Sequence, residues 1–362
     1  MKPTRLFFLD AVRAFAILMM LQGHFIDTLL HPIYRDNSYT AYTIWSYFRG
    51  ITAPVFFTIT GLVFVYLLLK SKEKGTDNKR IKKGLNRGLL LIGLGYALRF
   101  SFISLMYGKV NMNFLQVDVL QCIGLSLILL IILYRLSFKN EWLLATLFLV
   151  IGFTVFVTEP LYRTLKLEAV PVLFSNYLSL ANGSVFAIIP WFGYVAFGGF
   201  TAVLFSKFGH KNNYKPFKII SFLVIGLLLI FYSSIALKVL DNMFNIPLFT
   251  RSANYNYLFS RLGNVLVIFG LFYAFESYLK QALISKIGQK TLSIYVIHFM
   301  IIYGSFTGLS LKQFFYKSLT PTEAIIGAII FMIVVCLISF YYVKTNTFIY
   351  KKIRGLYEKL RR

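Results

Sequence analysis

The chain has 362 residues, of which 58% are hydrophobic and only 14% charged, and its formal net charge is +25. A soluble domain carries about a quarter charged residues, so this composition excludes an ordinary soluble enzyme, and the apolar content excludes a disordered chain. The only cysteines, Cys122 and Cys336, lie in apolar runs, which excludes a disulfide scaffold. We predict an all-α, polytopic integral membrane protein.

Apolar stretches of about 20 residues, the length that crosses the hydrocarbon core, recur ten times along the chain. The predicted spans are roughly 9–30, 48–69, 85–106, 117–135, 141–158, 183–205, 217–239, 258–279, 291–309 and 323–343. With the N-terminus inside, the inner segments hold 26 Lys and Arg residues and the outer loops hold 8. The positive-inside rule therefore predicts both termini in the cytoplasm and attributes the basic charge to topology, with no nucleic-acid partner.

We expect one transmembrane domain over residues 1–362, with a short basic cytoplasmic tail at about 344–362. Membrane lipids are its expected partners, and the abundance of Lys, Asn, Ile and Phe favours a bacterial inner membrane. The basic loop 70–84 is typical of a cytoplasmic anchor on anionic headgroups. Binding of a phosphorylated ligand by this loop is the alternative.

The first span carries ionisable groups, which are costly in a membrane and mark candidate sites. Spacings of three and four residues place a set of side chains on one helix face: Asp10, Arg13, Met20, His24 and Asp27. His24 can act as a general base near neutral pH, and Asp27 lies one turn further on, where it can orient the imidazole. The alternative is structural: Asp10 pairs with Arg13 at the interface, and His24 belongs to a buried hydrogen-bond network.

The pattern Asp10-x-x-Arg13-x10-His24 resembles the opening of the acyltransferase-3 superfamily of integral membrane acyltransferases. The segment 48–64, with Ala53-Pro54-Val55-Phe56-Phe57 followed by Gly61, is similar to bacterial proteins with the heparan-α-glucosaminide N-acetyltransferase catalytic domain. Segments 117–129, 189–199 and 287–304 resemble later parts of the same group. Ala14 departs from it, because relatives usually have Gly after the Arg.

The resemblance implies an enzyme that moves an acyl group, usually acetyl, from cytoplasmic acyl-CoA to a hydroxyl or amine, often on a sugar. In that interpretation His24 is catalytic, as a base or as an acyl carrier, with Asp27 beside it. Acyl-CoA would bind at the cytoplasmic end, where Arg forks suit phosphate groups. The residues expected there are Asp10, Arg13, Lys83 and Arg87, with Lys82 as a further candidate.

Further polar residues near span ends are predicted to bind the acceptor, a glycan or other hydroxyl or amine compound. They are Arg49, Arg99, Asp118, Gln121, Arg261 and, in the ninth span, His298. For the three arginines the alternative is that they extend to the headgroups, and for His298 it is a hydrogen bond to a neighbouring helix.

Two other functions are alternatives to an acyltransferase. The same polar groups could line the path of a transporter or exporter of a small polar or lipid-linked molecule, although no related halves are detectable. A purely structural membrane protein leaves Asp10, Arg13 and His24 unexplained together. Neither a phosphate-binding loop of the Walker type nor a Cys/His cluster with metal-ligand spacing occurs, so no metal is expected.

Overall fold

The computed structural model describes residues 6–100, 106, 112–163, 165–208, 214–306 and 308–360, with side chains of the last helix described as far as residue 341. Within these ranges the chain forms α-helices and short 3-10 helices and contains no strand. One isolated parallel bridge pairs Leu30 with Leu319. The all-α prediction is confirmed.

The first half of the described chain contains α1 (Phe7–Leu29), η1 (Pro32–Tyr34), α2 (Thr40–Glu73), α3 (Asp77–Arg99), η2 (Met112–Leu115), α5 (Val119–Leu136), α6 (Glu141–Val157), α7 (Glu159–Tyr162) and α8 (Val172–Leu178). The second half contains α9 (Ile188–Phe208), α10 (Lys215–Phe244), α11 (Pro247–Asn254), α12 (Tyr257–Ala274), α13 (Glu276–Leu279), α14 (Ala282–Gln289), α15 (Thr291–Tyr303), α16 (Leu311–Phe315) and α17 (Pro321–Leu360).

A helix lies at each of the ten predicted spans. Among the described residues, seven helices are long and apolar enough to cross a membrane: α1, α2, α5, α9, α10, α12 and α17. Two others, α6 and α15, are apolar but shorter, and α3 carries a charged first half. These helices support a polytopic membrane protein, while the number of spans and the side of the termini stay predictions.

Several helix ends differ from the predicted span ends by five residues or more. The ninth span was expected to reach residue 309, but α15 ends at Tyr303, because Gly304 adopts a left-handed conformation with φ of 71°. The sixth was expected from residue 183, whereas α9 begins at Ile188. The third begins eight residues earlier than expected, since the polar segment after Asp77 is also helical. α3 ends at Arg99, short of the predicted residue 106, and residues 101–105 lie outside the described residues. The expected tail at 344–362 continues α17 as far as Leu360.

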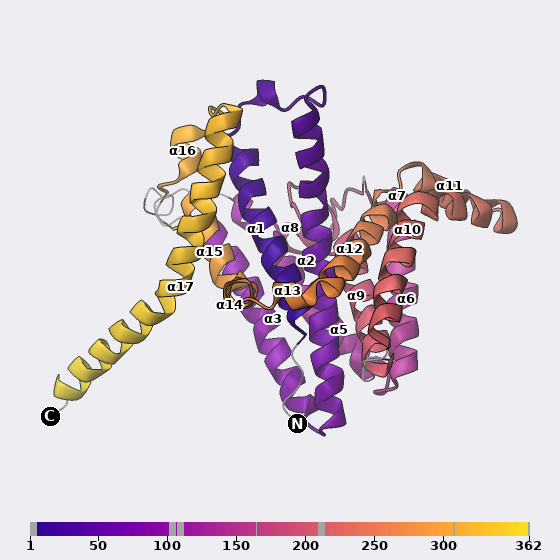
Figure 1. Cartoon of the computed structure of the whole chain (residues 1–362), viewed down its shortest axis with the longest axis horizontal. Helices are drawn as coiled ribbons and strands as arrows, with labels where there is room; N and C mark the ends of the chain where they lie inside the picture. The colour runs from indigo at the N-terminus through magenta and orange to yellow at the C-terminus, as the bar shows by residue number, and fades with distance from the viewer. Residues whose placement is uncertain are drawn as a thin grey trace.

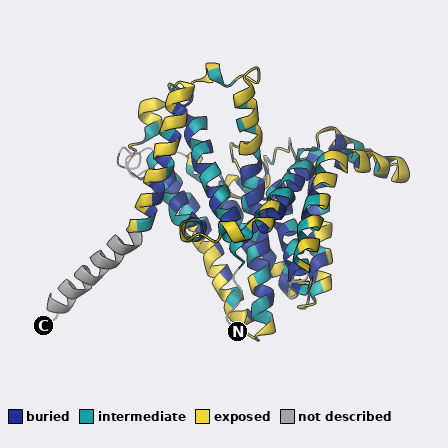
Figure 2. Cartoon of the chain, viewed as in Figure 1, coloured by how far each residue is buried: buried dark blue, intermediate teal, exposed yellow. Residues whose placement is uncertain are grey.

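Helix α1 lies inside the bundle, between α17 on one side and α2 on the other (Figure 1). It also contacts α12, α14 and α15. The faces that point away from this centre are apolar: α10 exposes Leu228 and Phe231, and α17 exposes Ile325 and Ile329 (Figure 2). Apolar outer faces are what a lipid environment requires, and the few polar groups of α1 lie inside the bundle.

Glycines bring pairs of helices into close contact, as small residues do in membranes. A Cβ added at Gly198 on α9 would collide with the backbone of Thr58 on α2. On α3, a Cβ at Gly88 would lie 2.8 Å from the carbonyl oxygen of Gly124 on α5. These glycines let α2 pack closely against α9 and α3 pack closely against α5.

The α3–α5 contact predicts a difference between two glycines on one helix. We expect Gly88→Leu to lower stability by about 1–3 kcal/mol, since the side chain overpacks the interface. Gly93→Leu is the matched control, because a Cβ at Gly93 meets nothing within 4 Å. It should leave stability unchanged or raise it by roughly 0.8 kcal/mol through helix propensity. Thermal unfolding of both purified variants in one detergent measures the difference, and equal melting temperatures would contradict the close contact.

Candidate functional site

Two cavities lie along one face of α1, one near each end of the helix. The first, here called the His24 cavity, has a volume of about 720 Å³ and is lined from α1 by His24, Asp27 and Thr28. The second, the Arg13 cavity, has a volume of about 610 Å³ and is lined from α1 by Arg13, Ile17 and Met20. The three- and four-residue spacing therefore places these side chains on a common face, as predicted.

The neighbours of α1 run along it and contribute to both cavities. α15 lies parallel to α1, with Thr291 at the Arg13 end and Tyr303 at the His24 end. α3 begins beside the Arg13 cavity and ends with Arg99 in the His24 cavity, whereas α5 runs in the opposite direction from Asp118. The site is therefore built from several helices around α1.

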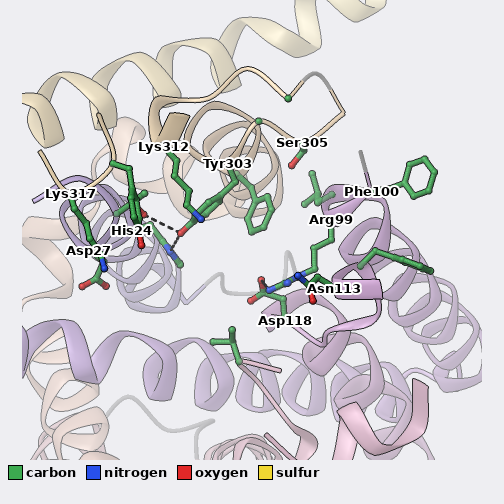
Figure 3. A pocket seen from close by; sticks show the side chains of 18 of the residues that line it. His24, Asp27, Arg99, Phe100, Asn113, Asp118, Tyr303, Ser305, Lys312 and Lys317 are labelled. Carbon is green, nitrogen blue, oxygen red and sulfur yellow. Dashed lines mark hydrogen bonds and ion pairs between the residues drawn. The ribbon is translucent and has the colours of Figure 1, made fainter. Parts of the chain in front are cut away.

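His24 makes its one described hydrogen bond through Nδ1. That nitrogen lies 2.9 Å from the hydroxyl of Tyr303, the last residue of α15. The Thr28 hydroxyl, one turn beyond His24, lies 3.5 Å from the same phenol oxygen. This contact fixes the ring and leaves Nε2 as the nitrogen available for chemistry (Figure 3).

Asp27 is placed beside His24 but bonds elsewhere. Its carboxylate forms an ion pair with Arg49 of α2, and the two side chains are 25% and 50% exposed. Across the cavity, Arg99 donates to the carboxylate of Asp118 at 3.0 Å (Figure 3). The contact that orients the imidazole thus comes from Tyr303, a residue that the sequence interpretation missed.

His298 stands between the two cavities. It is fully buried, and its ring centroid lies 5.3 Å from that of His24 and 4.8 Å from that of Tyr295, which lines the Arg13 cavity. Within the described part of the chain, neither ring nitrogen has a hydrogen-bond partner. On α5, Asp118 lines one cavity and the adjacent Val119 lines the other. The two cavities therefore approach each other at this level, with the buried His298 beside them.

The Arg13 cavity is basic at one end and apolar along most of its walls. Its four cationic residues are Arg13, Arg80, Lys83 and Arg87, and none of its lining residues is acidic. Arg13 donates to the Thr291 hydroxyl at 3.2 Å. Arg80, which lies 5.6 Å from the Phe64 ring centroid, was not singled out from the sequence because its segment was interpreted as a loop. Such a cavity suits a ligand with anionic groups at one end and an apolar arm.

Four of the remaining predicted residues line neither cavity. Asp10 contacts α14 through its carbonyl, against Gly288. Lys82 is exposed. Gln121 is fully buried and caps α5, accepting a hydrogen bond from the Asp118 amide at 3.2 Å. The guanidinium of Arg261 packs against α2 at Gly50.

The His24 cavity also contains residues that the sequence interpretation did not single out. They are Asn113, Tyr303, Ser305, Lys312 and Lys317. Tyr303 and Ser305 lie near the end of the ninth predicted span, and Asn113, Lys312 and Lys317 lie in predicted loops, where residue spacing indicates no face. Across the described ranges, no group of three or more His, Cys, Asp or Glu side chains is arranged to hold a metal ion.

Comparison with known proteins identifies the family to which this chain belongs. A search of curated proteins finds no match. The family model described as "Heparan-alpha-glucosaminide N-acetyltransferase, catalytic" matches residues 5–238, which is more than half of the chain and includes both Arg13 and His24. This confirms that part of the resemblance. The chain belongs to the family of heparan-α-glucosaminide N-acetyltransferase catalytic domains, a family of membrane acetyltransferases.

Proposed function

We propose that this protein transfers an acyl group, in the first place acetyl, from acyl-CoA in the Arg13 cavity to a hydroxyl or amine of a sugar-type acceptor in the His24 cavity. The observation that carries the proposal is the presence, on one face of α1, of an acid-free basic cavity at one end and an imidazole at the other. Family membership supports the reaction class.

The donor end is argued from charge and length. Arg13, Arg80, Lys83 and Arg87 present guanidinium and ammonium groups that suit the phosphates of CoA. The apolar walls beyond them suit the pantetheine arm. Arg13 and His24 are eleven residues apart, about 16 Å along the helix, so an extended arm reaches from the basic end toward the imidazole.

The positive-inside pattern orients the reaction. It places the Arg13 cavity toward the cytoplasm, where CoA thioesters are made, and the His24 cavity toward the outside. We propose ten spans with both termini in the cytoplasm, in a bacterial inner membrane. The acceptor would then meet the acyl group from the outer side.

The chemistry at His24 has two routes, both starting from Nε2. When Nδ1–H donates to Tyr303, Nε2 is the free base: it takes the proton of the acceptor as that group attacks the thioester carbonyl, and the C–S bond breaks to release the thiolate. Alternatively, Nε2 itself attacks the carbonyl and the C–S bond breaks to release the thiolate; the acceptor then attacks the acyl-histidine, the bond from the acyl carbon to Nε2 breaks, and the freed imidazole takes the acceptor proton. His298 is fully buried and lines neither cavity, so on either route its ring, 5.3 Å from that of His24, would support the imidazole by packing.

For the acceptor we propose contacts with Arg49, Arg99 and Asp118, which line the His24 cavity. Gln121 and Arg261 support the site by packing, since neither lines it. A transporter would also need polar cavities at two levels. The family match favours the enzyme over that alternative.

The role of His24 and its partner is tested by two variants. We expect His24→Ala to abolish acetyl transfer, because no other imidazole lines this cavity among the described residues. Tyr303→Phe should lower kcat by roughly 10–100-fold with acetyl-CoA affinity unchanged, since general base catalysis contributes about 10²–10⁴-fold and the ring is only partly misoriented. Release of CoA thiol with amino-sugar acceptors measures both rates.

His31→Ala is the control for these variants, because His31 is exposed and lines neither cavity. It should have full activity. A folded His24→Ala protein with wild-type turnover, or a wild type that transfers acetyl to no hydroxyl or amine, would refute the proposal.

The donor site is tested by charge removal. Arg13→Gln and Arg80→Gln should each weaken acetyl-CoA binding by roughly tenfold or more, as expected when a charge-assisted hydrogen bond of about 1.5–3 kcal/mol is lost. Lys82→Gln, which removes an exposed cation from the same helix as Arg80, should bind normally. Isothermal titration with acetyl-CoA measures all three. Identical dissociation constants would place the donor elsewhere.

A further inference from the structure

The His24 cavity is lined by more positively than negatively charged side chains. Four cationic residues line it against two carboxylates. Asp27 forms an ion pair with Arg49, and Asp118 forms an ion pair with Arg99 at 3.0 Å. Both carboxylates therefore already have a guanidinium partner, and the two remaining cations have no carboxylate partner in this cavity.

Those two cations are Lys312, on α16, and Lys317, two residues after that helix. Within the described ranges, no carboxylate forms an ion pair with either lysine. Their ammonium groups lie 5.3 Å and 5.0 Å from the centroid of the same ring, that of Tyr316. The pKa of the Tyr316 phenol is lowered, because the Lys317 ammonium donates a hydrogen bond to it and adds its charge. Each ammonium is attracted to the ring, and together the two lysines concentrate positive charge on this part of the cavity wall.

The backbone fixes this pair close to His24. The amide of Lys317 donates to the carbonyl of Thr28 at 3.2 Å, and the amide of Leu319 donates to the carbonyl of Leu29 at 2.9 Å. Thr28 is one helical turn from His24, about 6 Å along α1. In Figure 3 the side chain of Lys312 extends from α16 toward Tyr303, the partner of His24. The lysines thus belong to the same cavity wall as the imidazole.

A second, independent observation comes from Ser305. This residue lines the same cavity and is only 6% exposed, and its hydroxyl has no hydrogen-bond partner in the part of the chain that the structure describes. A buried hydroxyl without a partner costs free energy, so it is a site at which a ligand oxygen is favoured. It lies two residues beyond Tyr303, on the α15–α16 connection.

We infer that the α15–α16 side of the His24 cavity binds an anionic group of the acceptor, a phosphate or a carboxylate, with Lys312 and Lys317 as its counter-charges and Ser305 as a hydrogen-bond donor. The acceptor is therefore an acidic sugar derivative and not a neutral one. This inference rests on the proposed function and specifies its substrate. The three residues lie outside residues 5–238, so the family match says nothing about them.

The experiment compares three probes that share one amine: D-glucosamine, D-glucosamine 6-phosphate and 2-amino-2-deoxyglucuronic acid. Binding to the full chain in nanodiscs of zwitterionic lipid is measured by calorimetry without CoA. We expect the acidic probes to bind about tenfold or more tightly than glucosamine, the gain of one charge-assisted hydrogen bond, and added salt to reduce this preference. The better acidic probe tells whether a phosphate or a carboxylate is recognised.

Variants of the lysines and of Ser305 test whether these residues cause the preference for acidic probes. The double variant Lys312→Gln/Lys317→Gln should lose the preference for acidic probes, and Lys312→Arg/Lys317→Arg should retain most of it. Ser305→Ala should reduce it partly. Lys166→Gln, which removes an exposed lysine that lines neither cavity, is the matched control and should bind like the wild type.

Equal affinity for acidic and neutral probes, or an unchanged preference in the folded Gln double variant, would overturn the inference. Acetyl transfer to each probe is measured on the same preparations. If transfer occurs equally to all three, the anion site is wrong while the proposed function stands. If the acidic probes bind through the lysines and no transfer occurs, the anion site is supported and the proposed function fails.

Discussion

The cost of placing polar groups in hydrocarbon is the constraint on which this structure depends. Helix α1 carries Arg13, His24 and Asp27 through a segment that is otherwise apolar, and each must find a partner inside the protein. The partners come from different helices: Thr291 and Tyr303 from α15, and Arg49 from α2. Enclosing α1 in this way is what creates a polar interior, and with it the two cavities.

Close helix contacts make that enclosure possible. α2 and α9 approach at Gly198, and α3 and α5 approach at Gly88, where a larger side chain would separate them. Arg99 of α3 lines the His24 cavity and Phe64 of α2 lines the Arg13 cavity. The helices joined by these small residues therefore also supply walls of both cavities.

How far the sequence predicts the site depends on how local the signal is. The face shared by Arg13 and His24 follows from helical periodicity alone, and the structure confirms it. The hydrogen bond between His24 and Tyr303 joins residues 279 positions apart, and no pattern within one segment encodes it. The end of α15 was also missed, because it is set by the left-handed Gly304 and not by hydrophobicity.

The sequence also does not predict which basic residues face a cavity. The basic run at 70–84 was visible, but its residues divide in space: Arg80 and Lys83 line a cavity, whereas Lys82 points away. Composition cannot make this distinction, because it depends on which side of α3 faces α1. The residues predicted to bind the acceptor show the same limit. Arg99 and Arg261 have similar positions in their predicted spans, but Arg99 lines the His24 cavity and Arg261 packs against α2.

The separation of the two cavities fits the proposed transfer of an acyl group between two substrates. A continuous aqueous path from the Arg13 cavity to the His24 cavity would let ions and protons cross as well as substrate. Met20 and the fully buried His298 occupy this level instead. In the proposed reaction neither CoA nor the acceptor has to pass through the bundle, because only the small acyl group must reach the imidazole from one side while the acceptor approaches from the other. In that proposed reaction the acyl group has only the side chains at this level to pass, so a single helix face with arginine at one end and histidine at the other would bring donor and acceptor together.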